Sequence, residues 1–203
     1  MDALLPQLQI KLPDNGQLNP ASLFPRRHDS IWLEIGFGNG EHLAALMRRH
    51  PDRAWIGAEP FVNGMGSFLK EIAADPHDNI RVWMDDAIPL VDALPDRSLD
   101  GIYVLNPDPW PKRRHAKRRI ISAENLDRFA RILKTGSLLI MSTDVDKLAN
   151  WMVTQAANHP TFEWTAERAS DWRDMPPDWV VTRYQQKGVK AGRRQTYLIF
   201  KRI

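Results

Sequence analysis

A carboxylate and a run of cations stand side by side in one stretch of this 203-residue chain. Asp108 lies within the sequence PDPWP at 107–111, and residues 112–119 contain six Lys or Arg and no acid. Because proline fixes its own φ and disfavours helix in the residue before it, PDPWP is stiff, extended backbone that can aim one carboxylate. The adjoining cations suit a polyanion. Together these features indicate an enzyme that acts on a nucleic acid.

A second group of chemically useful residues surrounds the sequence GFGNG at 36–40. Its three glycines, Gly36, Gly38 and Gly40, allow positive φ and let a ligand approach the backbone. The N-terminus of the helix predicted behind them would attract polar or anionic groups. The spacing differs from the Gly-x-Gly-x-x-Gly of dinucleotide folds, because the third glycine comes one residue early.

Three carboxylates accompany this turn. Glu34 comes just before the glycines, and Glu59 and Asp86 close the next two predicted strands. Glu59 lies 19 residues after Gly40, near the spacing of the acid that accepts ribose hydroxyls in dinucleotide folds. NAD is disfavoured, because Glu34 would repel a pyrophosphate next to the glycines. An acid there suits a cationic ligand, so we predict a site for S-adenosylmethionine.

The elements that would position these residues alternate between strand and helix. Short apolar runs predict five strands, at 31–35, 54–58, 80–84, 99–105 and 137–142. Helical spacing predicts helices at 41–49, 62–74, 88–93, 123–133 and 145–158. Two further strands, at 161–166 and 195–201, are separated by a polar connection. The pattern predicts a single-domain α/β fold with a doubly wound, Rossmann-like sheet that is mostly parallel and has an antiparallel C-terminal edge.

The charge is distributed unevenly along the chain. Residues 112–119 and 179–203 contain 13 of the 28 Lys and Arg and none of the 25 Asp and Glu. The rest of the chain therefore holds 15 cations against 25 acids, a net charge of −10. An acidic body with two basic segments is typical of a directed electrostatic footprint for nucleic acid.

The composition is that of a soluble globular protein, with 43% apolar and 26% charged residues. No apolar stretch approaches the roughly 18 residues of a membrane span, and no secretory signal is evident. Cysteine is absent, which fits a reducing cytosol. We expect a cytoplasmic protein that has no membrane partner, and we assign no metal site.

Six motifs occur in an order that closely resembles the bacterial tRNA (guanine-N7-)-methyltransferase family. They are LEIGFGNGE at 33–41, GAEP at 57–60, PDPWPK at 107–112, HAKRR at 115–119, STD at 142–144 and TRY at 182–184. The PDPW and KRR elements are more specific than the glycine turn. The resemblance implies a class I S-adenosylmethionine-dependent methyltransferase domain at 31–203. We expect the preceding residues, 1–30, to form an N-terminal arm.

The resemblance also implies roles for single positions. Glu34, Glu59 and Asp86 would contact S-adenosylmethionine, and Asp108 would lie at the active site. The positions that match the tRNA-binding residues of the family are Lys112, Asp144, Thr182, Arg183 and Gln185. The usual target of the family is a guanosine in the tRNA variable loop. Gln185 is a departure, since the family usually has an acid there.

The chemistry expected of such an enzyme requires no strong base. Guanine N7 has an in-plane lone pair and no proton, so the enzyme must mainly align nitrogen, methyl carbon and sulfur. We hypothesise that Asp108 or Asp144 accepts hydrogen bonds from guanine N1–H and the exocyclic amine. Carboxylates near the base would also stabilise its developing positive charge.

Two other functions compete with this prediction. Methyltransferases of exocyclic amines have an Asn/Asp-Pro-Pro-aromatic loop after the fourth strand, which NPDPW at 106–110 partly matches. A non-catalytic RNA-binding protein with the same fold is the other alternative, and the intact cofactor acids argue against it. The chain would act as a monomer or a homodimer.

Overall fold

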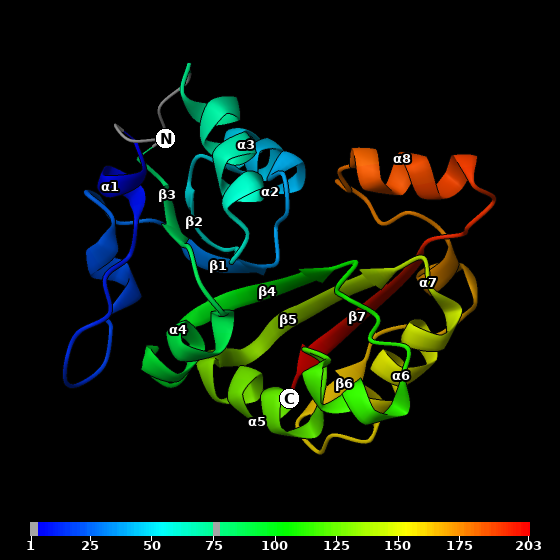
Figure 1. The fold of residues 1–203 in the computed structure, drawn as a ribbon. Helices are drawn as coiled ribbons and strands as arrows, with labels where there is room; N and C mark the ends of the chain where they lie inside the picture. Colours follow the sequence, from blue (N-terminus) through cyan, green and yellow to red (C-terminus); the bar gives the residue numbers. More distant parts are fainter. Residues whose placement is uncertain (1–3, 75–77) are drawn as a thin grey trace.

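The computed structural model describes residues 4–74 and 78–203, apart from the side chain of Arg113. Within these residues a seven-stranded sheet has the order β3-β2-β1-β4-β5-β7-β6 (Figure 1). Its strands are β1 Ser30–Ile35, β2 Arg53–Ala58, β3 Ile80–Trp83, β4 Leu99–Leu105, β5 Leu133–Thr143, β6 Phe162–Trp164 and β7 Thr196–Arg202. β1 to β5 pair in parallel, and β7 is antiparallel to β5 and β6. The predicted sheet, with its antiparallel C-terminal edge, is confirmed.

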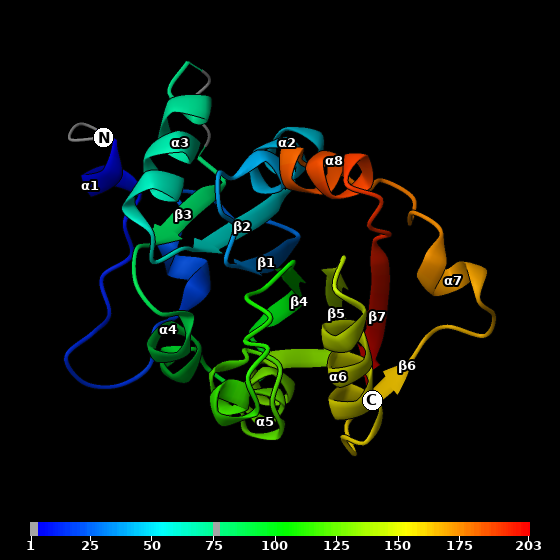
Figure 2. The same ribbon diagram turned by 45° about the vertical axis from the view of Figure 1, so that its right-hand side comes forward.

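Helices cover both faces of this sheet. α2 Glu41–Arg49 and α3 Val62–Ile72 lie on one face (Figures 1 and 2). α4 Ala87–Ala93, α5 Ala123–Ile132 and α6 Asp146–Ala157 lie on the other face. Each of the five was predicted from its apolar spacing, and the observed bounds differ by at most two residues. The alternation brings the carboxyl ends of β1 to β5 to one edge of the sheet, where ligands bind in this architecture.

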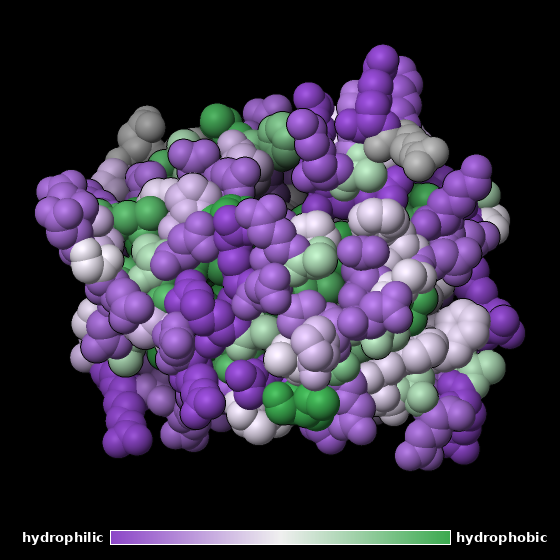
Figure 3. Space-filling model, turned by 90° about the horizontal axis from the view of Figure 1, so that it is seen from below, coloured by the Kyte–Doolittle hydropathy of each residue, from purple (hydrophilic) through white to green (hydrophobic). Residues whose placement is uncertain are grey.

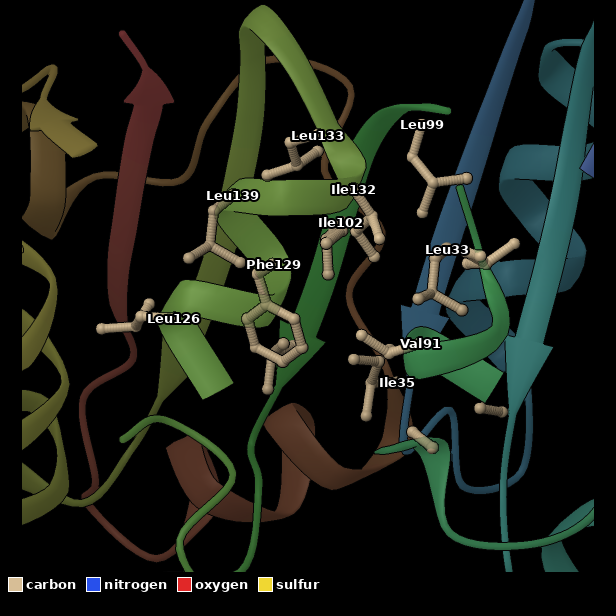
Figure 4. Close-up of a cluster of buried hydrophobic side chains, with 14 of the residues drawn as sticks. Leu33, Ile35, Val91, Leu99, Ile102, Leu126, Phe129, Ile132, Leu133 and Leu139 are labelled. Carbon is tan, nitrogen blue, oxygen red and sulfur yellow. The ribbon is translucent and has the colours of Figure 1, made fainter. Parts of the chain in front are cut away.

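The helices that cover the second face are polar outside and apolar inside. Arg128 of α5 pairs with Asp92 and with Glu124, and the lower face of the molecule is mostly hydrophilic (Figure 3). Beneath this surface, side chains of α4 and α5 pack on β1, β4 and β5 in a buried cluster that includes Val91 and Phe129 (Figure 4). None of the helices in the described parts of the chain combines the length and apolar content needed to cross a membrane.

The described residues before β1, from residue 4 onward, pack along the outer edge of the sheet. They include α1 Leu5–Leu8 and a 3-10 helix, η1 Pro20–Leu23. The N–H of Ile10 donates to the carbonyl of Val82 in β3, at 2.8 Å. Ile10, Leu18 and Phe24 are buried in the cluster on the α4–α6 face. This segment therefore covers the edge strand β3.

The region between β6 and β7 differs from the expected polar connection. It contains α7 Ser170–Arg173 and α8 Arg183–Lys190, and α8 lies near α2 above the carboxyl ends of the strands (Figures 1 and 2). The sequence of α8 does not predict this position because the residues it buries are Gln185 and Gly188, not apolar side chains. β5 also begins earlier than expected, because Leu133 pairs with Leu99 before the register shifts.

Candidate active site

The glycine turn after β1 leaves room for a ligand. Gly36 and Gly38 have φ values of +71° and +58°, and a Cβ atom at either position would meet no atom within 4 Å. Gly40 differs, because its Cβ would overlap the ring of Phe68. The first two glycines thus open the turn toward a ligand, and the third lets α3 pack against it.

Two cavities meet at this turn. The larger, of about 650 Å³, reaches the ends of β2, β3 and β4, and the smaller, of about 250 Å³, reaches α2 and the start of α8. Both are lined by Gly36, Gly38, Asn39 and Asn106. The acids predicted to bind the cofactor divide between them, with Glu59 and Asp86 in the larger cavity and Glu34 in the smaller. An elongated ligand that follows the turn would meet acids at both of its ends.

Glu59 is held by two backbone amides. Its Oε2 accepts a hydrogen bond from the N–H of Gly38 at 2.8 Å, and its Oε1 accepts one from the N–H of Phe61 at 2.9 Å. Since each carboxylate oxygen can accept two hydrogen bonds, Glu59 retains capacity for two ribose hydroxyls. Asp86 is exposed and caps α4, where its Oδ1 accepts from the N–H of Ile88 at 2.8 Å.

Glu34 is paired with a histidine in the first turn of α2. Its Oε2 lies 2.8 Å from Nδ1 of His42, and the two residues are only 1% and 2% exposed. The His42 ring contacts Tyr103 and Trp179, with ring centroids 4.9 and 5.6 Å away. Burial, followed by the charge of Glu34, raises the pKa of Tyr103 above its usual value. The pair thus fixes a carboxylate at the smaller cavity, where it suits an ammonium group.

The loop at 106–111 is anchored on both sides. Asn106 and Trp110 have left-handed backbone, with φ values of +48° and +40°, a strained conformation for a tryptophan. The side-chain amide of Gln195 donates to Oδ1 of Asn106 at 2.8 Å. The guanidinium of Arg119 donates to the carbonyls of Pro109 and Trp110, both at 3.0 Å. These bonds hold the loop as a fixed wall of the larger cavity.

The two aspartates predicted to face the substrate are placed differently. Asp108 is exposed and lines the larger cavity. Asp144 is 7% exposed, its Oδ2 lies 2.7 Å from Nε of Arg193, and its Oδ1 accepts from the Tyr184 hydroxyl at 3.3 Å. Burial, followed by the charge of Asp144 and more weakly that of Asp108, raises the pKa of Tyr184. Tyr184 thus connects the smaller cavity, which it lines, to Asp144.

The basic run forms a 3-10 helix, η2 Arg113–Arg118, whose side chains have two different surroundings. The guanidinium carbon of Arg118 lies 4.9 Å from the centre of the Trp110 ring, and His115 packs edge-on against the same ring. With Arg119, these side chains support the 106–111 loop. Among the described side chains of the run, the exposed cations are Lys112, Arg114, Lys117 and Arg118. The run is therefore not one uniform phosphate-binding surface.

The predicted tRNA-binding segment at the start of α8 is fastened to α2. Thr182 Oγ1 accepts from the N–H of Gln185 at 3.3 Å and so caps α8. The N–H of Arg183 donates to Oε2 of Glu41 at 2.6 Å, and its Nε lies 3.1 Å from Oε1 of the same residue. The Arg183 side chain is nevertheless 81% exposed, so it remains accessible to a large ligand.

The side chain of Gln185 lies on the buried side of α8 and lines neither of the two cavities. It is 7% exposed, its Oε1 accepts from Nε1–H of Trp179 at 3.0 Å, and its Nε2 donates to the Tyr197 hydroxyl at 2.8 Å. An acid at this position would accept both bonds. The departure from the family pattern therefore affects a buried network that positions α8.

Sequence reasoning missed His42 as a member of this site, and it predicted neither the pairing of Arg193 with Asp144 nor the bonds from Arg119 to the 106–111 loop. His42 had a local signal, because it lies two residues after the glycine turn. Arg193 had none, because its partner Asp144 lies 49 residues away.

The assembled residues fit S-adenosylmethionine. The open glycine turn gives access to the backbone. Glu34 lines the smaller cavity, where it suits a cationic group, and Glu59 can accept hydrogen bonds from ribose hydroxyls. Within residues 4–74 and 78–203, no group of three or more His, Asp or Glu is arranged to hold a metal ion.

We expect Arg119→Ala to destabilise the protein because it removes two hydrogen bonds to the 106–111 loop and the contact of the guanidinium with Trp151. Hydrogen bonds that involve a charged group contribute about 1.5 to 3 kcal/mol each, so the free energy of unfolding should fall by at least about 2 kcal/mol. Urea denaturation measures this. Lys117→Ala, the control, removes an exposed cation of the same run and should change the value by less than about 0.5 kcal/mol. Equal effects would contradict the role given to Arg119.

Known proteins resemble this chain along almost its whole length. The model of a family described as putative methyltransferase matches residues 28–198. A tRNA (guanine-N(7)-)-methyltransferase of Rhodospirillum rubrum is 47% identical over 205 residues, which cover 100% of this chain and 80% of the relative. One of Rhizobium meliloti is 46% identical over 202 residues, covering 100% and 87%.

Solved structures share the fold at much lower identity. The 16S rRNA methyltransferase KamB has a TM-score of 0.64 at 16% identity and covers 87% of this chain and 89% of its own. A precorrin-6y C5,15-methyltransferase of Geobacter metallireducens has a TM-score of 0.56 at 14% identity, covering 90% and 86%. These two matches establish the methyltransferase fold, and the sequence relatives establish the family. The chain belongs to the tRNA (guanine-N7-)-methyltransferase family.

Proposed function

We propose that this protein transfers the methyl group of S-adenosylmethionine to N7 of a guanosine in the variable loop of tRNA. The observation that carries the proposal is the larger cavity, which Glu59 and Asp86 line from one side and Asp108 and Trp110 from the other. A cofactor and a purine base held by these residues would share one space. Family membership and the exposed cations of the chain support tRNA as the substrate.

The cofactor is held along the glycine turn. Glu34 would hold its ammonium group and Glu59 its ribose hydroxyls, and the exposed Asp86 would contact it in the larger cavity. When bound, S-adenosylmethionine supplies a methyl group on a positively charged sulfur. The protein contributes the acids that attract this cation and the glycines that let it approach the backbone.

Asp108 orients the base. Of the two candidate aspartates, it is the one that lines the cavity, whereas Asp144 is engaged by Arg193 and Tyr184. The Asp108 carboxylate accepts hydrogen bonds from guanine N1–H and the exocyclic amine, which selects against adenine. Its charge favours the positive charge that the base gains. Since N7 carries no proton, Asp108 removes none.

The tRNA backbone meets exposed cations, which are Lys112, Arg114, Lys117 and Arg118 of the basic run and Arg183 of α8. Asp144, Thr182 and Gln185 contribute to substrate binding by fixing the position of α8. In this proposal the methyltransferase domain comprises residues 31–203 and the N-terminal arm residues 1–30. The protein acts in the cytoplasm as a monomer or a homodimer.

Incubation of the protein with an unmodified tRNA transcript and radiolabelled S-adenosylmethionine tests the function. We expect one labelled product, which nucleoside mass spectrometry identifies as 7-methylguanosine and digestion maps to the variable loop. A product methylated on an exocyclic amine would contradict the proposed chemistry. No transfer and no calorimetric binding of S-adenosylhomocysteine would instead indicate a non-catalytic RNA-binding protein.

Replacement of Asp108 tests the role of the orienting carboxylate. We expect Asp108→Asn to lower kcat by about 100-fold, since an amide cannot supply the charge that stabilises the methylated base. Affinity for S-adenosylhomocysteine, measured by calorimetry, should stay within about twofold because the cofactor acids are intact. Wild-type turnover in Asp108→Asn and in Asp108→Ala would exclude this assignment.

Replacement of His42 tests how Glu34 is held. We expect His42→Leu to weaken the binding of S-adenosylhomocysteine by about tenfold, because Glu34 loses the hydrogen bond that holds its carboxylate. We expect His42→Asn to restore part of the affinity. The affinity for tRNA should not change. The matched control is His159→Leu, because His159 is also buried and paired with an acid, Asp127, but does not line either cavity. Equal cofactor affinities in His42→Leu and the wild type would show that Glu34 needs no partner.

A further inference from the structure

A third cavity opens where α6, α7 and the strands β6 and β7 meet. It has a volume of about 550 Å³, close to that of the larger cofactor cavity. Its lining includes two tryptophans, Trp164 and Trp172, and two arginines, Arg173 and Arg194. None of the residues described above as binding the cofactor or the base lines it.

This cavity lies directly behind the active-site edge of the sheet. Thr196, which lines it, pairs with Thr143 of β5, the residue before Asp144. Arg193 and Arg194 are adjacent in the chain but serve different sides, because Arg193 pairs with Asp144 and Arg194 lines the cavity. A large substrate bound at the active site would therefore pass close to this opening.

The lining combines flat aromatic surfaces with exposed cations. The Arg173 guanidinium carbon lies 4.4 Å from the centre of the Trp172 ring. Arg194 is exposed, and its contact with Asp174 is long, at 3.9 Å. The buried Nε1–H of Trp164 has no acceptor within the described part of the chain, although buried donors are normally satisfied. The cavity thus offers aromatic surfaces and positive charge.

We propose that this cavity binds one unpaired nucleotide of the tRNA, distinct from the target guanosine. Its volume is within the range of small-molecule sites. A base stacks on the indole of Trp172 or Trp164, since proteins bind unpaired RNA bases on aromatic and guanidinium planes. Arg194 meets the phosphate, and the carboxylate of Asp146, at the same opening, accepts from an amino group of the base. The inference rests on the proposed function, because it takes tRNA as the substrate.

Affinity measurements on the full chain with unmodified tRNA transcript test the proposal. We expect Trp172→Ala and Arg194→Ala together to raise the Kd for tRNA by about tenfold, and Trp172→Phe alone to retain most of the affinity. The matched control is Arg27→Ala, because Arg27 is an exposed arginine that lines a cavity at the opposite end of the sheet. Its Kd should stay within about twofold. At saturating tRNA, kcat of the double variant should remain near that of the wild type.

Photocrosslinking locates the nucleotide directly. With benzoylphenylalanine in place of Trp172, we expect a crosslink to a nucleotide other than the methylated guanosine. Wild-type tRNA affinity in the double variant, or the absence of a crosslink, would overturn the inference while leaving the methylation assay intact. A change in sedimentation behaviour without a change in tRNA affinity would assign the cavity to a protein interface and also overturn it. If the wild-type protein did not bind tRNA, the proposed function itself would be contradicted.

Discussion

The site depends on how a group of carboxylates at one edge of a sheet is neutralised. Because parallel strands end at the same edge, the acids at the ends of β1 to β5 gather there: Glu34, Glu59, Asp86, Asp108 and Asp144. Acids so placed repel one another and lose hydration when they are buried. The buried ones have separate partners, two backbone amides for Glu59, an imidazole for Glu34 and a guanidinium for Asp144. Asp108 keeps its exposure, which leaves it available to a substrate.

The same charges hold the C-terminal segment in place. Asp144, just after β5, pairs with Arg193, which follows α8, and Glu41 of α2 pairs with Arg183 at the start of α8. Asp178 adds a further connection to α2. It accepts hydrogen bonds from Arg49, the last residue of α2, and from His50, which follows it. The hydrogen bond to His50 lowers the pKa of Asp178, so this contact is favoured when the acid is ionised. The smaller cavity owes one of its walls, Thr182 and Tyr184, to these long-range ion pairs.

The sequence predicts the part of this arrangement that follows from local patterns. Apolar periodicity located the strands and the five helices that cover the sheet, and strand ends located the acids. It could not predict α8, because that helix is positioned by Gln185, Arg193 and other polar contacts to residues far along the chain. The basic run at 112–119 likewise did not indicate that Arg119 bonds to the 106–111 loop. A count of cations does not say which way each side chain turns, and a 3-10 helix sends the side chains of one run to different sides.

The acid and the cations at 107–119 form one unit. Attack by guanine N7 requires no proton transfer, so what the protein contributes is alignment, which depends on a loop that does not move. Left-handed backbone at Asn106 and Trp110 costs free energy, which the bonds from Gln195 and Arg119 offset. Because Arg118 and His115 also pack on Trp110, part of the basic run stabilises the loop that carries Asp108. His115, Arg118 and Arg119 therefore affect where that carboxylate points, while the exposed cations of the run remain accessible to the polyanion.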